Sequence, residues 1–423
     1  MSVILTERKR LFMSAPFIPV LLGSDVNVYG MARSFHEAYG QYGVTSYAIG
    51  KKALGATSNS KIVKVAVTEP DLENDEVFVK TLVKFAEEHQ NGKQLLLVPC
   101  GDNYIKLLVR NQEALRPYYT FSCIDEDLLM RLSIKESFYQ VCTEHGFLFP
   151  KTTTCTAENY KEVELPFDFP CIIKPSNSVA YWNCTFPHKK KVFLANNKQE
   201  FDDILAAIYG SSYQDHLILQ EYIPGEDCQM RVMNCYCGKD KKVKLIALGH
   251  ALLEEHSPEG IGSYAAIINT VDHALAKQMK EFLEDIGYVG FANFDMKLDP
   301  RDGKYKLFEM NLRQGRSSFF VTAAGYNLAT FLVNDLILNQ PMGCVVADEP
   351  ALWSIIPKHV IFKYVHDEDL KAEAKELIKA HRYIHSFYYE PDLSLKRRVY
   401  YLKNQLNYVK KYKKYFGNKG LHE

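Results

Sequence analysis

The chain has 423 residues, with 51 Lys and Arg against 51 Asp and Glu, so its formal net charge at pH 7 is zero. A balanced chain has no overall attraction for nucleic acid, and nucleic-acid binding is not expected. Hydrophobic residues make up 47% of the sequence, as in ordinary globular proteins, and the length exceeds what one core usually serves, so we expect two or three domains.

The N-terminus and the cysteines indicate the compartment. The first residues, MSVILTERKRLFMSAPF, contain no continuous apolar stretch of the kind found in signal peptides. No apolar run approaches the ~20 residues that span a bilayer. The ten cysteines are scattered, and only Cys235 and Cys237 lie close together, without zinc-type spacing. We therefore expect reduced thiols in a cytoplasmic protein.

The first predicted unit alternates strands and helices, which is typical of a small α/β domain. The predicted strands lie at 17–22, 61–67 and 94–100, and the predicted helices at 31–39 and 76–90. The turn at 23–30, GSDVNVYG, has two interpretations. It is either an ordinary strand-to-helix connection or a substrate loop at the carboxyl end of a strand.

After residue 125 the alternation gives way to a mixed pattern. Helices are predicted at 125–146, 197–209 and 272–286, and strands at 171–176, 190–195, 216–223 and 290–299. The turn PRDGK then leads into a further strand that begins at residue 306, so the last two strands form a hairpin.

This hairpin carries the clearest chemical pattern. Glu309, Asn311 and Arg313 recur at every second residue, so they share one face of a strand. If Asp295 on the first strand faces the same way, then Asp295, Glu309 and Asn311 offer oxygen ligands to a Mg²⁺ ion shared with phosphates. The alternative is a solvated face of an edge strand, which the otherwise apolar strands do not favour.

Two lysines fit the phosphates of a nucleotide. Lys174 ends an apolar strand, where a lysine is normally excluded. Lys135 lies on a preceding helix and can reach the same anion, although a surface lysine is the alternative there.

The segment QEYIPGED, residues 220–227, fits the rest of a nucleotide. Its backbone groups at Glu221 and Ile223 suit the edge of an adenine, and the Pro-Gly turn then directs Asp227 towards a ribose. The alternative is an ordinary strand and turn with solvated acids.

Taken in this order, these features resemble the ATP-grasp superfamily over residues 126–340. The resemblance implies an α/β protein with an N-terminal pre-ATP-grasp domain at 16–125, an ATP-grasp domain at 126–345 with a lid at about 150–223, and a C-terminal extension at 346–423. It also implies a role for each matching residue. Phosphate binding falls to Lys135 and Lys174, adenine binding to Gln220, Glu221, Tyr222 and Ile223, ribose binding to Asp227, and Mg²⁺ binding to Asp295, Glu309 and Asn311.

Longer stretches resemble the bacterial D-aspartate ligase family nearly from end to end. They are IPVLLGSDVNVYGMARSFHEAYG, GFANFDMKLDPRDGKYKLFEMNLRQGRSSFFVTAAG and the basic C-terminal tail. The resemblance implies that ATP activates the β-carboxylate of D-aspartate as an acyl phosphate. The lysine ε-amine of the peptidoglycan precursor UDP-MurNAc-pentapeptide then displaces the phosphate. Lys174, Arg313 and Arg316 are the implied catalytic residues, with Arg313 stabilising the oxyanion and Arg316 holding a carboxylate.

The sequence departs from the superfamily pattern at two places. No glycine follows Lys174 in the loop PSNSVAYWNCTFPHKKK, so Lys189–Lys191 are expected to supply charge there instead. Asn293 stands where D-alanine–D-alanine ligases have an arginine, which leaves the oxyanion to Arg313. An ATP-grasp kinase, a silent nucleotide-binding module, and a ligase for another acid or acceptor remain as alternatives.

The C-terminal segment LKRRVYYLKNQLNYVKKYKKYFGNKG, residues 395–420, has many basic residues and no acid. At helical spacing its aromatic residues lie beside cations. One interpretation is a solvated helix whose tyrosines pack on the enzyme. The other is a weak contact with an anionic membrane surface, which would place the protein peripherally at the inner face of the membrane.

Overall fold

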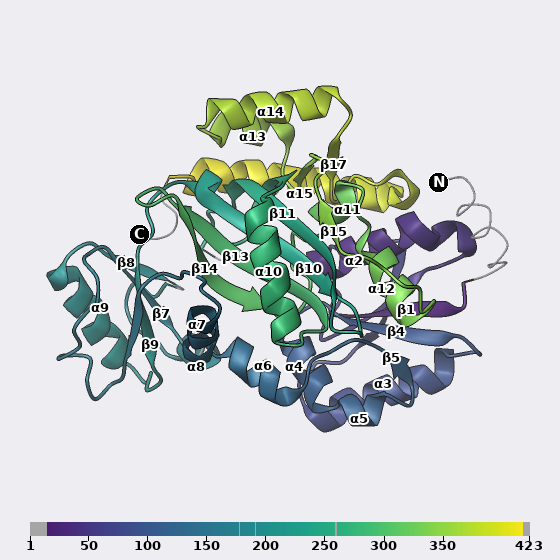
Figure 1. Cartoon of the computed structure of the whole chain (residues 1–423), viewed down its shortest axis with the longest axis horizontal. Coiled ribbons are helices and arrows are strands. Elements are labelled where there is room, and N and C mark those ends of the chain that lie inside the picture. The colour runs from purple at the N-terminus through teal and green to yellow at the C-terminus, as the bar shows by residue number, and fades with distance from the viewer. Residues whose placement is uncertain (1–14, 177, 191, 259, 418–423) are drawn as a thin grey trace.

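The computed structural model describes residues 15–176, 178–190, 192–258 and 260–417. The N-terminal segment considered above for a signal peptide lies outside these residues up to position 14, as does Lys191 of the lysine run. Three β-sheets organise the described chain (Figure 1). No helix among the described residues is both long enough and apolar enough to cross a membrane.

The N-terminal sheet is fully parallel, with the strand order β3-β2-β1-β4-β5. Its strands are β1 (Phe17–Leu22), β2 (Ser46–Gly50), β3 (Val63–Thr68), β4 (Gln94–Pro99) and β5 (Tyr119–Thr120), and its helices are α2 (Val26–Tyr39), α3 (Asp75–His89), α4 (Asp102–Arg110) and α5 (Gln112–Leu115). The predicted α/β alternation is confirmed, although β2 and β5 were not predicted. Asp25 begins α2 by accepting hydrogen bonds from the backbone N–H groups of Asn27 and Val28.

A second, four-stranded sheet is antiparallel, in the order β6-β9-β7-β8. It contains β6 (Thr152–Cys155), β7 (Cys171–Pro175), β8 (Phe193–Ala195) and β9 (Leu217–Glu221), with helices α8 (Ser178–Asn183) and α9 (Lys198–Tyr209). It has a hydrophobic core of its own, in which Ile173 and Phe201 are buried. Helices α6 (Glu126–Ser133) and α7 (Lys135–Glu144) connect it to the N-terminal unit. This sheet occupies the region predicted as the lid.

The large central sheet has the order β14-β13-β10-β11-β12-β16-β17, with β15 paired to β11. Its strands are β10 (Met230–Cys237), β11 (Val243–Glu254), β12 (Tyr264–Thr270), β13 (Gly290–Asp299), β14 (Lys304–Asn311), β15 (Val345–Ala347), β16 (Leu352–Ser354) and β17 (Tyr383–His385). The hairpin predicted around PRDGK is β13 and β14. The last two strands come from beyond residue 345, and the predicted domain boundaries remain a prediction.

Helices cover this sheet and connect it to the N-terminal unit. They are α10 (His273–Asp285), α11 (Phe319–Ala323), α12 (Leu328–Leu336), α13 (Lys358–Tyr364), α14 (Glu368–Lys379) and α15 (Leu395–Tyr415). Gly30 on α2 faces Phe319 so closely that an added Cβ would lie 3.3 Å from the Phe319 side chain. The missing side chain lets α2 pack against α11, so one hydrophobic core continues from the N-terminal unit into the central sheet.

Candidate active site

The β13–β14 hairpin places the predicted metal-binding residues together. In its antiparallel register Asp295 lies opposite Glu309, and Asn293 lies opposite Asn311. The amide nitrogen Nδ2 of Asn311 donates hydrogen bonds to Asp295 Oδ2 and to Asn293 Oδ1, both at 3.1 Å. The polar faces of the two strands therefore coincide, as the spacing of two residues required.

The electrostatics of this face fit a cation. Desolvation, followed by the nearby charge of Glu309, raises the pKa of Asp295 well above its ordinary range. Tyr264 donates a hydrogen bond of 2.9 Å to Asp295 Oδ1, and burial keeps this phenol protonated because it raises its pKa. Two carboxylates that repel each other at a desolvated site are the arrangement that a divalent cation stabilises.

The ligand set also fits Mg²⁺ in its chemistry. Among the described residues, no cluster of three or more His, Cys, Asp or Glu side chains is placed to hold a metal. The hairpin has two carboxylates and one amide, which leaves coordination positions for phosphate oxygens and water. A Mg²⁺ ion that also binds a nucleotide usually has only a few protein ligands of this kind.

The two predicted phosphate-binding lysines line the same cavity. Lys135 begins α7, and its Nζ lies 3.6 Å from Glu309 Oε2. Lys174 on β7 donates a hydrogen bond of 2.9 Å to Gln220 Oε1. A cavity of about 820 Å³ between the four-stranded sheet and α6–α7 is lined by Lys135, Lys174 and Glu309. The residues predicted to bind phosphate therefore line one cavity.

The side chain of Gln220 is held by hydrogen bonds and in turn orients Lys174. It is 1% exposed, and its Nε2 donates to the hydroxyl oxygens of Tyr139 at 2.8 Å and of Thr152 at 2.9 Å. Because its carbonyl accepts from Lys174, the amide fixes the position of the lysine head group. The predicted adenine contact of Gln220 remains a prediction.

The other residues of the predicted adenine-binding segment 220–223, here called the hinge, lie at the end of β9 and directly after it. The backbone N–H of Glu221 donates to Lys151 O at 2.8 Å, so this group is used within the sheet. The carbonyl of Ile223 accepts from Lys297 Nζ at 2.9 Å, and the same ammonium lies 5.7 Å from the centre of the Tyr222 ring. Lys297 therefore holds the hinge against β13.

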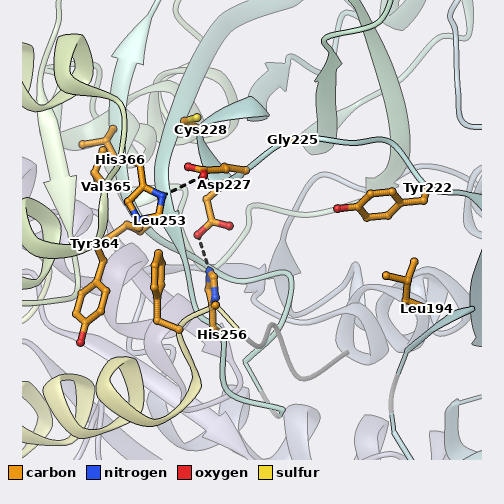
Figure 2. Close-up of a pocket in the computed structure, with 14 residues that line it drawn as sticks. Leu194, Tyr222, Gly225, Asp227, Cys228, Leu253, His256, Tyr364, Val365 and His366 are labelled. Atoms are coloured by element: carbon orange, nitrogen blue, oxygen red, sulfur yellow. Dashed lines mark hydrogen bonds and ion pairs between the residues drawn. The ribbon is translucent and has the colours of Figure 1, made fainter. Parts of the chain in front are cut away.

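Asp227 lines a different cavity, of about 390 Å³ (Figure 2). Its Oδ2 accepts hydrogen bonds from His256 Nε2 at 2.7 Å and from the backbone N–H of Glu254 at 2.9 Å. Tyr222 lies across this cavity from His256, and Phe416 from the C-terminal end of the chain also lines it. The predicted ribose acid thus faces a space bounded by the hinge and by the C-terminal segment.

Arg313 and Arg316 have separate surroundings. Arg313 donates to Asp102 Oδ2 at 2.8 Å and to Asn311 Oδ1 at 3.3 Å, so it lies beside the metal-binding face. Arg316 donates to Glu255 Oε2 at 3.3 Å and to the hydroxyl of Tyr408 on α15 at 3.0 Å. The structure therefore joins Arg313, but not Arg316, directly to the predicted metal ligands.

The predicted turn at 23–30 is shorter in the structure, because α2 already begins at Val26, and the start of this helix reaches the same region. The side chain of Asn27 donates to Cys100 O and to Gln314 O, each at 2.9 Å. Gln314 stands between the two arginines in the sequence. The start of α2 is therefore packed against the arginine-bearing segment, and the role of residues 23–30 as a substrate loop remains a prediction.

Lys189 makes its observed contacts with neighbouring residues of the same segment. It donates to Cys184 O at 2.5 Å, and its ammonium lies 5.3 Å from the Tyr181 ring centre. Its expected contribution to phosphate binding is untested.

Sequence reasoning missed several residues of the site. Lys297 was detectable, because it follows Asp295 by two residues and therefore shares its strand face. His256, Glu255 and Tyr264 gave no comparable signal. Their contacts join segments far apart in the chain, which only the folded structure brings together.

Comparison with known proteins places the chain in a family, although no family model matches it. It is 44% identical over 411 residues to the D-aspartate ligase of Enterococcus faecium strain Aus0004, covering 95% of this chain and 97% of that protein. It is also 26% identical over 262 residues to the carbamoyl phosphate synthase large chain of Vibrio cholerae. That match covers 56% of this chain and 23% of the relative.

Solved structures share the fold at low sequence identity. The N5-carboxyaminoimidazole ribonucleotide synthetase of Thermus thermophilus matches with a TM-score of 0.55 and 15% identity, over 79% of this chain and 82% of that chain. The L-amino acid ligase of Bacillus licheniformis matches with a TM-score of 0.53 and 13% identity, over 75% and 74%. These similarities confirm the predicted ATP-grasp fold, and the identity along nearly the whole chain shows that this protein belongs to the D-aspartate ligase family.

Proposed function

We propose that the protein is an ATP-dependent carboxylate–amine ligase that uses D-aspartate. The observation that carries the proposal is the 44% identity to a D-aspartate ligase over 95% of the chain. The paired carboxylates and the amide of the β13–β14 hairpin support it, because they suit Mg²⁺ and a nucleotide.

The reaction begins with phosphoryl transfer. A β-carboxylate oxygen of D-aspartate attacks the γ-phosphorus of ATP, and ADP leaves, which gives an acyl phosphate. Asp295, Glu309 and Asn311 would hold Mg²⁺, which would neutralise charge on the phosphate oxygens. Lys135 and Lys174, which both line the 820 Å³ cavity, hold the phosphates. Gln220 keeps Lys174 in place.

The second step forms the amide bond. The acceptor amine attacks the acyl carbon, the tetrahedral oxyanion collapses with loss of inorganic phosphate, and the amine nitrogen loses its proton. Arg313 stabilises the oxyanion, since its guanidinium lies beside the Asn311 carboxamide at the edge of the metal site. Positioning and electrostatics supply the catalysis, and no nucleophilic side chain is needed.

Substrate binding involves the segment around Arg316. We place D-aspartate between the segment 23–30, which includes the start of α2, and Arg316. Glu255 and Tyr408 hold the guanidinium of Arg316, so its parallel N–H donors are oriented to bind the carboxylate that does not react. The acceptor is the lysine ε-amine of the peptidoglycan precursor UDP-MurNAc-pentapeptide. The adenosine of ATP lies towards Tyr222 and Asp227 in the 390 Å³ cavity.

The location that suits this reaction is the cytoplasm. All ten cysteines are free thiols, and most are buried, which fits a reducing compartment. A peripheral position at the inner face of the membrane is compatible with this location.

Trapping of the acyl phosphate tests the proposal against its alternatives. Purified protein with ATP, Mg²⁺ and hydroxylamine is offered D-aspartate, L-aspartate and other acids, without the precursor. The proposal predicts D-aspartate-dependent ADP and an aspartyl hydroxamate. ADP with a stable phosphoester would identify a kinase, and bound ATP without ADP release would identify a silent module.

A further inference from the structure

Helix α15 exposes an apolar row. Leu395, Val399, Leu402 and Leu406 are 79%, 43%, 59% and 62% exposed. They follow one another at intervals of four, three and four residues, so they lie along one face of the helix. Isolated exposed leucines are ordinary, but a row of four on one helix face is not.

A row of cations runs beside the apolar row. Lys396, Lys403 and Lys410 are exposed and recur every seven residues, which places them about a quarter-turn from the leucines at ~100° per residue. None of the ion pairs among the described residues includes these three lysines. The helix has eight basic residues and no acid. Because the whole chain is neutral, the rest of the protein carries the opposite excess.

The opposite face of α15 is held by the protein, so the exposed rows cannot turn inward. Tyr412 donates a hydrogen bond of 2.6 Å to Glu254 O, and Gln405 donates to Ile355 O at 3.1 Å. Tyr408 and Tyr412 are buried. Lys411 pairs with Glu255 and therefore belongs to this anchored face. Tyr408 and Tyr412 therefore pack on the enzyme, as one of the two interpretations of the tail expects.

From these observations we infer that α15 is a docking surface for an anionic lipid bilayer. A helix that lies flat at the interface inserts an apolar row and places lysines beside it, where their ammonium groups reach the lipid phosphates. The 21 residues of α15 provide a contact about 30 Å long. The acidic excess elsewhere orients the molecule, because an anionic surface repels the body and attracts the helix.

A second copy of the chain fits this surface less well. Packing two α15 helices through their leucines brings together two strongly basic helices that contain no acid to pair with the lysines. Anionic lipid supplies the missing negative charge. The inference concerns the surface of α15 alone, and vesicle binding can be measured without any enzymatic activity.

Vesicle binding by charge variants is the first test. The full chain is mixed with vesicles of phosphatidylglycerol and phosphatidylcholine, or of phosphatidylcholine alone, and the bound fraction is measured by sedimentation. The wild type should bind only the anionic vesicles, and less at high salt. The variant K396Q/K403Q/K410Q should bind about 100-fold more weakly. The matched control K64Q/K80Q/K84Q removes three exposed lysines elsewhere and should bind as the wild type does.

The apolar row is tested separately. The variant L402Q/L406Q should lose binding to anionic vesicles while keeping the KM for ATP, whereas the control L148Q/V271Q, at two exposed apolar positions elsewhere, should not. Absence of wild-type binding at low salt overturns the inference. So does equal loss in the control variants, or a wild-type dimer in sedimentation velocity that L402Q/L406Q dissociates.

Discussion

At the scale of single residues, Asn311 connects the parts of the proposed metal site. Its amide nitrogen donates to Asp295, and its carbonyl oxygen accepts from Arg313. One side chain thus links a proposed metal ligand to the proposed oxyanion-stabilising residue. Glu309 makes the corresponding link to Lys135.

We expect Glu309→Gln and Asn311→Ala to abolish nearly all D-aspartate-dependent ADP formation at saturating Mg²⁺. Glu309→Gln removes the negative charge of one ligand, and Asn311→Ala removes an oxygen ligand, at a site where few protein ligands hold the ion. ADP release is measured beside thermal unfolding, which should remain close to that of the wild type. Asp302→Asn, in the turn of the same hairpin, is the matched control. Near-normal turnover in either site variant would refute the metal assignment.

Arg313→Lys should lower kcat by about 10²–10³, the usual loss when one oxyanion donor is removed. A lysine keeps the charge but not the planar fork of donors. Steady-state kinetics with D-aspartate measures the effect, and Arg116→Lys, at an exposed ion pair with Glu113, serves as the control. A lysine variant with wild-type kcat would leave Arg313 a structural role.

Residue positions on one strand were predictable from the sequence, because a strand alternates its faces strictly. That alternation placed Asp295, Glu309 and Asn311 together. Asp227 and His256 lie 29 residues apart in the sequence and meet only in the folded chain. A periodic sequence pattern could therefore not predict their contact. The hydrogen bond from Lys174 to Gln220 likewise depends on the pairing of β7 with β9, which the sequence alone did not predict.

At the scale of elements, α15 reaches into the proposed substrate site. Tyr408 accepts a hydrogen bond from Arg316, and Lys411 pairs with Glu255. Burial raises the pKa of Glu255, but the hydrogen bond from Lys411 and the charge of Arg316 outweigh it and leave this pKa below its usual value. Glu255 therefore stays ionised and holds the guanidinium of Arg316.

Tyr408→Phe should raise the KM for D-aspartate about 2- to 10-fold, the worth of one hydrogen bond, with unchanged kcat and KM for ATP. The reason is that Arg316 loses one of the two groups that orient it. Tyr401→Phe on the same helix is the control. An unchanged KM for D-aspartate would mean that Arg316 needs no support from α15, and a general loss of kcat would indicate a structural defect.

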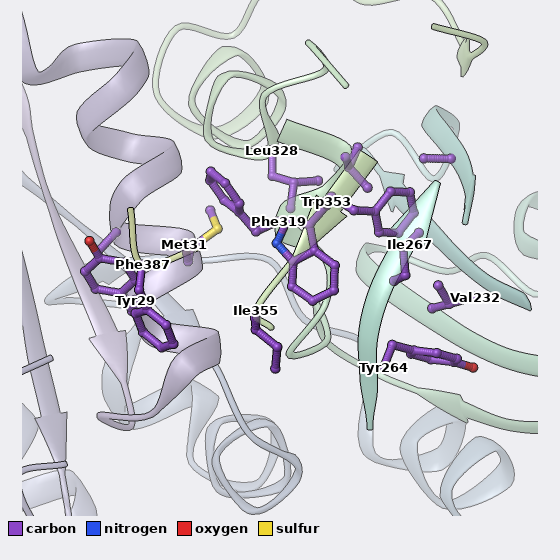
Figure 3. Packing of buried hydrophobic residues seen from close by; sticks show 14 of the residues in the cluster. Tyr29, Met31, Val232, Tyr264, Ile267, Phe319, Leu328, Trp353, Ile355 and Phe387 are labelled. Atoms are coloured by element: carbon purple, nitrogen blue, oxygen red, sulfur yellow. The ribbon is translucent and has the colours of Figure 1, made fainter. Parts of the chain in front are cut away.

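At the scale of the whole molecule, α2 and the C-terminal region pack against the central sheet around Trp353 (Figure 3). Tyr29 and Phe387 lie at one end of this core, and Ile267 and Tyr264 at the other. A buried ion pair closes the end near Tyr29. Arg397 on α15 lies 3.2 Å from Asp392, which also accepts from the Tyr29 hydroxyl at 2.9 Å.

Arg397→Met should lower the free energy of unfolding by about 3–5 kcal/mol, because it leaves the buried carboxylate of Asp392 without its cation. Urea denaturation followed by tryptophan fluorescence measures the loss. Arg382→Met, at the exposed pair with Glu349, should cost at most about 1 kcal/mol. Equal midpoints for the two variants would contradict the account of the core.

The α/β alternation of the N-terminal unit was predictable from the sequence, because apolar periodicity and turn residues are local signals, whereas the ATP-grasp fold was implied by the resemblance to the superfamily. The strands β2 and β5 were missed for identifiable reasons. The five residues of β2 include Ser46 and Gly50, and β5 has two residues, so neither shows a period. Strands β16 and β17 join the central sheet through pairings distant in sequence, which a local pattern does not encode.

The central claim, an acyl phosphate formed on the β-carboxylate of D-aspartate, is tested most directly by oxygen transfer. D-aspartate labelled with ¹⁸O in its β-carboxylate is turned over with ATP, Mg²⁺ and the precursor, and inorganic phosphate is analysed by mass spectrometry. The account predicts one ¹⁸O in each phosphate released, and none when only the α-carboxylate is labelled. Unlabelled phosphate from the β-labelled substrate, or label arriving from the α-carboxylate, would contradict it.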